Sequence, residues 1–398
     1  MSHVNKCFGT MASLWALFHG GAAYAEVTAS AEVSARAQAS TNPYLSSGED
    51  TGSGAFVLNL SPTIAAGDEV TSFKLTGRLT HTEFTRRYDA ATNYGITGAL
   101  TQKVAPNLDM KASIGFDSVI VDSGDILTPT IVGDLIGGPA VVPGDTTLNG
   151  LQQRREFFSG DVDFRYRATG RDLIDFGGSF GIVRFPSGTL VRDYDTIGYR
   201  AGYGRKISDA LTLGFSGSAS QTDYRQQLIG DSRSYALQGT VSARFGSRWT
   251  MQASAGPSFA SIRTAVGRVR QTSFGGSLNI CNGDAIARTC VFASRSYQPS
   301  ALGGVRPLTN WGASHSRRLD ERSDLQASAS FGRAQLGLVG LARSNGFARA
   351  DLTYNRRFSP TIKGYASVGY ADSFRDVINR RANAQFNLGV TYLFGRRA

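Results

Sequence analysis

A Gly-x-Ser-x-Gly pattern at 177–181 is the one segment of this chain that resembles the nucleophile motif of serine hydrolases. Such a serine needs a nearby base, and His81 and His315 are the candidate residues. The pattern lies inside a stretch of alternating polar and apolar residues, whereas the hydrolase motif needs a sharp turn from a strand into a helix. A chance match in a chain rich in glycine and serine explains it better. We therefore expect no catalytic residue and no enzyme activity, with a barrel enzyme that acts on lipid as a remote alternative.

Two further pairs could support chemistry. Asp161 and Asp163 would share one face of a strand, as any two residues two apart do, so a metal site there is weakly supported. Cys281 and Cys290 lie close in sequence and could form a disulfide in an oxidising compartment such as a periplasm. Zinc, phosphate-loop and dinucleotide motifs are missing from the sequence, so we expect no cofactor and no metal.

Strict alternation of polar and apolar residues dominates the rest of the chain. The segment NLDMKASIGFD (107–117) places Leu108, Met110, Ala112, Ile114 and Phe116 on one side and mostly charged or small residues on the other. A period of two indicates β-strands, and the runs are about ten residues long or more, as in strands that cross a membrane at a tilt. Similar runs begin near 27, 73, 158, 211, 249 and 384.

The connections between these runs have two lengths. Short polar turns, such as 104–109 and 206–211, alternate with longer loops, such as 222–234 and 122–153. Short turns at one rim and long loops at the other are typical of outer-membrane barrels. The sequence therefore predicts an all-β fold: a closed antiparallel transmembrane β-barrel over 26–398, without a transmembrane helix.

A soluble sandwich would show the same alternation, but it would need more strands than one domain usually has. Aromatic residues beside the short turns also favour a membrane barrel, because they would form an interfacial girdle. In a barrel the polar face lines the lumen, and the candidate lumen charges are Lys111, Asp161, Asp163, Arg165, Arg167, Arg200, Arg244 and Arg349. Charges of both signs would suit ion preference or the passage of a hydrated sugar polymer.

The number of strands depends on residues 265–303. If this region is one loop, the barrel has sixteen strands; if 274–280 and 291–297 are strands, it has eighteen. In the second case Cys281 and Cys290 flank a short periplasmic turn and could join its two sides. Eighteen strands is the preferred prediction.

Residues 1–25 have the features of a secretory signal peptide, with a lysine, an apolar stretch and Ala23-Tyr24-Ala25 as the cleavage site. Export through the periplasm to the outer membrane of a Gram-negative bacterium is the expected route. The formal net charge of +11 is spread along the chain, which argues against a nucleic-acid partner.

Three segments resemble a known family: HTEFTRRYDAATNYGITGALTQKVAPNLDMKASIGFD, CVFASRSYQPSALGGVRPLTNWGASHSRRLDERSDLQASASFG and AQFNLGVTYLFGRR. They look like the β-barrel porins encoded with bacterial exopolysaccharide operons. The resemblance implies an outer-membrane barrel of eighteen strands that exports polysaccharide together with a periplasmic polysaccharide export protein. One departure is that 395–398 follow Phe394, although many such barrels end on an aromatic residue.

The functional expectation is an outer-membrane pore for exopolysaccharide export, and the alternative is a general diffusion porin for small hydrophilic solutes. The long apolar segment 122–153 could fold inward to gate the pore or could pack on neighbouring surface loops. The transported substrate, the oligomeric state and the redox state of the cysteines are left open.

Overall fold

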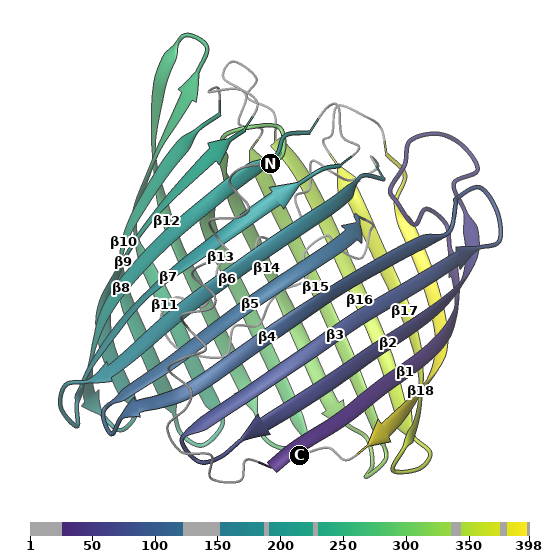
Figure 1. Ribbon diagram of the computed structural model, residues 1–398, viewed down its shortest axis with the longest axis horizontal. Helices are drawn as coiled ribbons and strands as arrows, with labels where there is room; N and C mark the ends of the chain where they lie inside the picture. The colour runs from purple at the N-terminus through teal and green to yellow at the C-terminus, as the bar shows by residue number, and fades with distance from the viewer. Residues whose placement is uncertain are drawn as a thin grey trace.

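The computed structural model describes residues 26–121, 152–186, 191–225, 230–335, 344–374 and 380–395. The expected signal peptide (1–25) and residues 122–151 of the long apolar segment lie outside the described residues. The described chain forms eighteen strands in one sheet (Figure 1). The strands are β1 Glu26–Ser40, β2 Ser53–Gly67, β3 Thr71–Phe84, β4 Ala91–Ala105, β5 Leu108–Ile120, β6 Arg154–Arg167, β7 Asp172–Arg184, β8 Tyr194–Ser208, β9 Leu211–Tyr224, β10 Ser232–Phe245, β11 Trp249–Thr264, β12 Gly267–Gly283, β13 Ala287–Pro299, β14 Val305–Arg318, β15 Ser323–Gln335, β16 Ser344–Arg357, β17 Ile362–Phe374 and β18 Asn383–Gly395.

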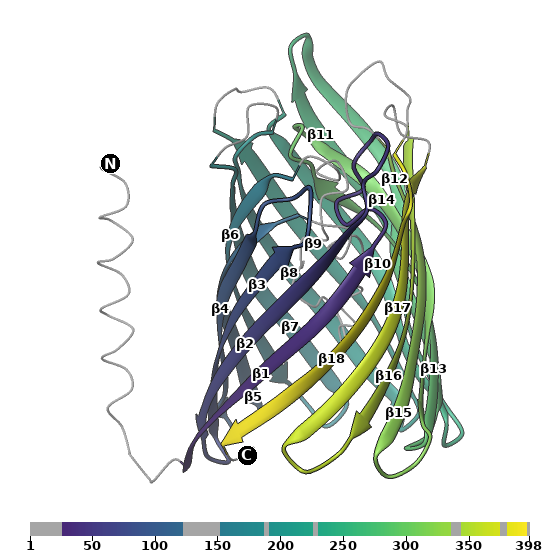
Figure 2. The same cartoon turned by 90° about the vertical axis from the view of Figure 1, so that its right-hand side faces the viewer.

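The sheet closes on itself. Every strand is antiparallel to its neighbour in sequence, and β1 pairs with β18 from Ser30↔Gly395 to Ser40↔Gln385 (Figure 2). Closure removes the edges that would leave backbone groups unpaired. The predicted closed antiparallel barrel of eighteen strands is therefore confirmed, and the sixteen-strand alternative is wrong because β12 and β13 occupy the region around the cysteines.

The two rims differ as the sequence predicted. At one rim the strands meet in short turns, at 68–70, 106–107, 168–171, 209–210, 246–248, 284–286, 319–322 and 358–361. At the other rim longer connections follow β1, β3, β5, β7, β9, β15 and β17, while those after β11 and β13 are short. We call these the turn end and the mouth of the barrel. No helix among the described residues is long and apolar enough to cross a membrane.

The outer surface of the wall is apolar. Many of its side chains keep large exposed fractions, for example 65% for Tyr199 and 58% for Leu237. At the turn end the exposed aromatic residues include Phe245, Trp249, Phe358, Tyr392 and Phe394. A band of apolar side chains with aromatic residues at its border is the surface that a barrel presents to lipid.

Cys281 on β12 and Cys290 on β13 lie directly opposite one another and form a disulfide, with a Cα–Cα distance of 4.0 Å. The turn at 284–286 lies between them. The bridge therefore joins the two sides of one hairpin at the turn end.

Candidate functional site: the barrel interior

Contacts between strands that are not neighbours in the wall identify the inner face. The hydroxyl of Tyr224, at the mouth end of β9, lies 2.7 Å from the carbonyl of Ser300 and 2.9 Å from that of Gly304. Residues 300–304 connect β13 and β14, and three strands, β10 to β12, separate β13 from β9. Such a contact is made through the interior, so Tyr224 and the residues that alternate with the outward ones face the lumen.

All eight charged residues that the sequence assigned to the lumen lie on this inner face. Lys111 faces Asp163 in the β5–β6 register, and Asp163 faces Gly177, which in turn faces Arg200. Asp161, Arg165 and Arg167 alternate with Asp163 on β6, Arg244 follows the inward Ser234 on β10, and Arg349 follows the inward Phe347 on β16.

Most of these charges have partners of opposite sign. The Nε atom of Arg165 donates to Asp175 at 2.9 Å, and Arg167 pairs with Asp109. Arg200 pairs with Asp163, and the Nε atom of Arg349 donates to Asp351 at 2.5 Å. Asp161 accepts a hydrogen bond from Ser113. From β5 to β8 the inner wall therefore carries a network of paired charges that hydrate readily and would interact with a polar solute.

Two ion pairs of the inner wall join strands that do not touch. Asp163 on β6 reaches Arg200 on β8 across Gly177 of β7, and Arg78 on β3 reaches Asp117 on β5 across Gly95 of β4, at 2.7 Å. A Cβ atom at Gly177 would lie 2.2 Å from the Asp163 carboxylate, and one at Gly95 would lie 2.1 Å from that of Asp117. The glycines leave the space in which each carboxylate lies against the wall.

In the structure, Gly177, the first residue of the Gly-x-Ser-x-Gly pattern, has this packing role. Gly177 and Ser179 lie within β7, and Ser179 faces Gly198 in the register with β8. His81 contacts Thr92, with 2.9 Å between its Nδ1 atom and Oγ1, and His315 contacts Thr289 at 2.8 Å. The two histidines lie on β3 and β14, so neither stands beside Ser179.

Among the residues that the structure describes, no group of three or more His, Cys, Asp or Glu side chains is arranged to hold a metal ion. Asp161 and Asp163 instead bond to Ser113 and Arg200. Both carboxylates thus belong to the polar surface of the wall.

At the mouth, the β13–β14 hairpin bends into the barrel. The β12–β13 register runs from Gly283↔Arg288 to Gly276↔Arg295, although β12 continues to Gly267 beside β11. Beyond this point Val305 packs with Ile262 on the inner side of β11, and Ala301 packs with Val183, Tyr194 and Tyr224 of the far wall. The hairpin therefore covers part of the mouth from inside.

The β1–β2 connection (41–52) enters the mouth from another side. Leu45 is completely buried against Leu308, Ala334 and Phe347 of β14, β15 and β16. At its base the buried Asn42 donates its backbone N–H to the side-chain oxygen of Asn383 at 2.9 Å and its side-chain amide to the carbonyl of Arg381 at 2.9 Å. Buried amides with several bonds fix the backbone around them. This connection is therefore held on both sides.

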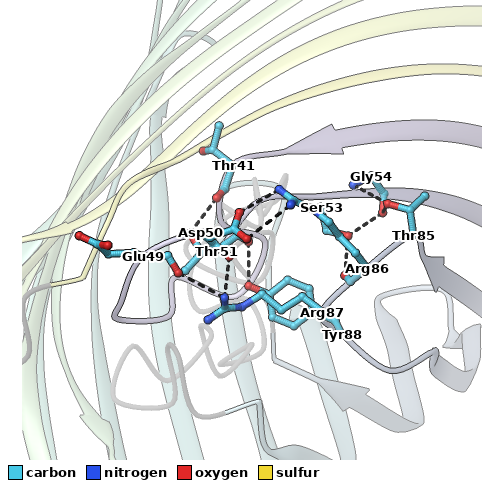
Figure 3. A network of polar contacts seen from close by, with 10 residues as sticks. All are labelled: Thr41, Glu49, Asp50, Thr51, Ser53, Gly54, Thr85, Arg86, Arg87 and Tyr88. Carbon is cyan, nitrogen blue, oxygen red and sulfur yellow. Dashed lines mark hydrogen bonds and ion pairs between the residues drawn. The ribbon is translucent and has the colours of Figure 1, made fainter.

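A polar network links the same connection to the one between β3 and β4 (Figure 3). Arg86 pairs with Asp50 at 2.9 Å, and Arg87 donates to the carbonyl of Asp50 at 2.6 Å. The hydroxyl of Tyr88 donates to the carbonyl of Thr51 at 2.8 Å. Three aromatic rings, those of Tyr44, Phe84 and Tyr88, pack beside this network. Two neighbouring connections thus form one ordered part of the mouth.

The turn end is stabilised by aspartates that bond to backbone amides. Hydrogen bonds from Thr71 and Val70 lower the pKa of Asp68, and those from Ala287 and Ile286 lower the pKa of Asp284. The backbone amide of Arg322 lowers the pKa of Asp320 in the same way. Each carboxylate favours its ionised form because that form is the better acceptor.

Sequence reasoning missed several residues of the interior. Asp117 lies on the same face of β5 as Lys111, and Arg78 belongs to the polar set of the alternating run from Phe73, so the same period-two pattern could have found both. The roles of Gly95, Gly177 and Tyr224 had no signal in the sequence, because each depends on which strand lies two or more positions away.

No protein-family model matches this chain, and no curated protein sequence matches it. Among solved structures, that of Pseudomonas aeruginosa OpdO is similar over 94% of this chain and 98% of its own, with 11% identity and a TM-score of 0.50. The structure of P. aeruginosa OpdQ shows 10% identity over 93% and 98% of the two chains, with a TM-score of 0.49. The likeness to OpdO is one of fold, and it agrees with the closed barrel described above.

Proposed function

We propose that this chain forms a pore in the outer membrane of a Gram-negative bacterium, through which small hydrophilic solutes pass. The observation that carries the proposal is the division of the wall into an apolar outer face and an inner face of paired charges. Water would solvate the outer face poorly, whereas lipid would cover it at no cost. A barrel of this strand number also encloses more space than its side chains fill.

The arrangement of the mouth favours small solutes over a polymer. The β13–β14 hairpin and residues 41–52 are anchored to opposite parts of the inner wall by buried apolar contacts and by bonds of Tyr224 and Asn42. Fixed segments of this kind narrow an entrance permanently. A solute that fits beside them would pass, and the ion pairs of β5–β8 would bind it weakly through hydrogen bonds.

Export of exopolysaccharide is the second candidate, and it rests on the sequence resemblance described first. Its partners would be the polymer and a periplasmic polysaccharide export protein. The same pore would then open more widely at the mouth. A deletion strain that still secretes normal amounts of polymer would count against export and would leave the solute pore unaffected.

The direct test is conductance. The protein purified in detergent, inserted into a planar lipid bilayer, should give discrete current steps in salt solution. Sugars of increasing size should reduce the current only while they are small enough to enter. A folded, inserted barrel without current steps would contradict the proposal, and blockage by the polysaccharide alone would favour export.

A further inference from the structure

The outer face of the β10–β12 segment carries four arginines near the mouth. Arg233 lies in register with Ser261, which faces Arg270, and Arg263 faces Arg268 in the next outward row. These residues alternate with inward ones such as Ile262 and share the outward side with Tyr235 and Phe259. They therefore lie directly beyond the apolar band, on the same strands.

These arginines are not paired with carboxylates: Asp231 lies opposite Arg263, but its carboxylate accepts a hydrogen bond from the backbone N–H of Tyr224 at 2.9 Å. Among the described residues, none of the four takes part in an ion pair, and the sequence from 232 to 283 contains no Asp or Glu. Arg184 and Arg225, outward residues of the neighbouring wall, both pair with Asp195, at 2.5 Å and 3.1 Å. The four arginines thus differ from other cations of the same rim.

The position of the hairpin adds to this contrast. β11 and β12 have 16 and 17 residues, and their joined ends project beyond the neighbouring strands (Figure 1, Figure 2). Val266, at the tip, is 90% exposed, and Phe274, lower on the outward face, is 67% exposed. Cationic and apolar side chains therefore follow one another along one outward surface.

Like charges directly opposite one another destabilise a strand pair, and Arg263↔Arg268 is such a pair. A multivalent anion between the guanidinium groups removes this repulsion. Arginine suits phosphate in particular, because its planar guanidinium group donates two parallel hydrogen bonds.

We propose that Arg233, Arg263, Arg268 and Arg270 form a binding surface for the phosphate groups of outer-leaflet lipids. The proposal rests on the proposed function, because it needs a barrel in the outer membrane. In such barrels the short turns face the periplasm, which places the mouth outward. A lipid fits better than a soluble anion because its acyl chains would lie on Tyr235, Phe259 and Phe274 while its phosphates reach the arginines. Lipid contact at this face would also hold the projecting hairpin upright.

The test compares three proteins in neutral detergent by native mass spectrometry. They are the unaltered chain, the variant R233Q/R263Q/R268Q/R270Q, and a control with the same charge change at the turn end, R317Q/R318Q/R356Q/R357Q. The probes are diphosphoryl lipid A and the same lipid without its phosphates. We expect the mouth variant to lose affinity for the phosphorylated lipid by at least about tenfold, with the control unchanged.

Equal binding of both lipids to the unaltered chain, or equal losses in the two variants, would overturn the proposal. Circular dichroism and retention of the Cys281–Cys290 bridge establish that each variant is folded. Single-channel recording separates the two proposals: the mouth variant should conduct like the unaltered chain, because its changes lie outside the lumen. An unaltered barrel that binds the lipid but never conducts would refute the pore alone.

Discussion

The carboxylate of Asp163 on β6 pairs with the guanidinium group of Arg200 on β8, across a strand that contributes only Gly177 at that level. Arg78 and Asp117 repeat the arrangement across Gly95. In both cases the ion pair lies against the inner wall. The pair can span two strand spacings because the glycine between its residues has no side chain.

Replacing Gly177 with alanine tests this arrangement. The new Cβ would lie 2.2 Å from the Asp163 carboxylate and 2.7 Å from the carbonyl of Val162, so the ion pair must move. We expect G177A to lower the free energy of unfolding by about 1–3 kcal/mol. Gly178 provides the control, because its Cβ would meet no atom closer than 3.7 Å. Denaturant titrations in detergent compare the two variants, and equal midpoints would contradict the role of Gly177.

Replacing Asp163 with asparagine should change ion preference. Arg200 would keep its charge without a carboxylate partner, with its side chain only 18% exposed. We expect the pore to shift towards anions, together with a loss of about 1–2 kcal/mol in the free energy of unfolding. Reversal potentials in a salt gradient measure the shift. The double variant D163N/R200Q restores the charge balance, and it should return the reversal potential towards that of the unaltered pore.

The hydroxyl of Tyr224 holds the inward hairpin through the carbonyls of Ser300 and Gly304. Removal of this hydroxyl in Y224F should weaken the attachment of the hairpin to the wall by about 0.5–3 kcal/mol, because the two buried carbonyls lose their donor. We expect more frequent closing events or a changed conductance in single-channel records. Tyr199, which faces outward and is 65% exposed, supplies the control variant Y199F. Identical records from both variants would show that the hairpin does not shape the mouth.

The Cys281–Cys290 disulfide closes a sequence separation of 9 residues at the turn end. On chain-entropy grounds its reduction should lower the free energy of unfolding by about 2–3 kcal/mol. Conductance should be unchanged, because the hairpin stays paired along β11 and β14. Unfolding and single-channel recordings with and without reductant measure both effects, and C281S/C290S serves as the reductant-insensitive control. A large conductance change on reduction would indicate a role in the pore itself.

Acid should weaken the turn end. The pKa of Asp284 is lower in the folded chain than its ordinary value of 3.8, because Ala287 and Ile286 donate backbone hydrogen bonds to it. Its contribution to stability is therefore complete above that value, and it is lost as the pH falls through the lower folded pKa. Unfolding midpoints measured from about pH 6 down to about pH 2 should fall less in D284N than in the unaltered chain. Parallel curves for the two proteins would exclude this turn as a source of acid sensitivity.

Much of the fold could be predicted because strand alternation is a local property. The segment around Lys111 already shows which side chains face the lumen, since successive residues leave opposite sides of a strand. The lengths of the connections are also a local property of the sequence, so they distinguished the two rims. The region around Cys281 and Cys290 was harder, because the alternation there is weaker and the decision between sixteen and eighteen strands depended on it.

The sequence by itself thus determined the strands, their two faces and the polarity of the barrel. Only the tertiary structure decided which charges pair, as Asp163 does with Arg200, and which connections turn inward, as residues 300–304 do towards Tyr224. The physical reason is distance along the chain. Alternation acts between adjacent residues, whereas these contacts depend on strand register and closure, which bring residues 37 and 76 positions apart into contact.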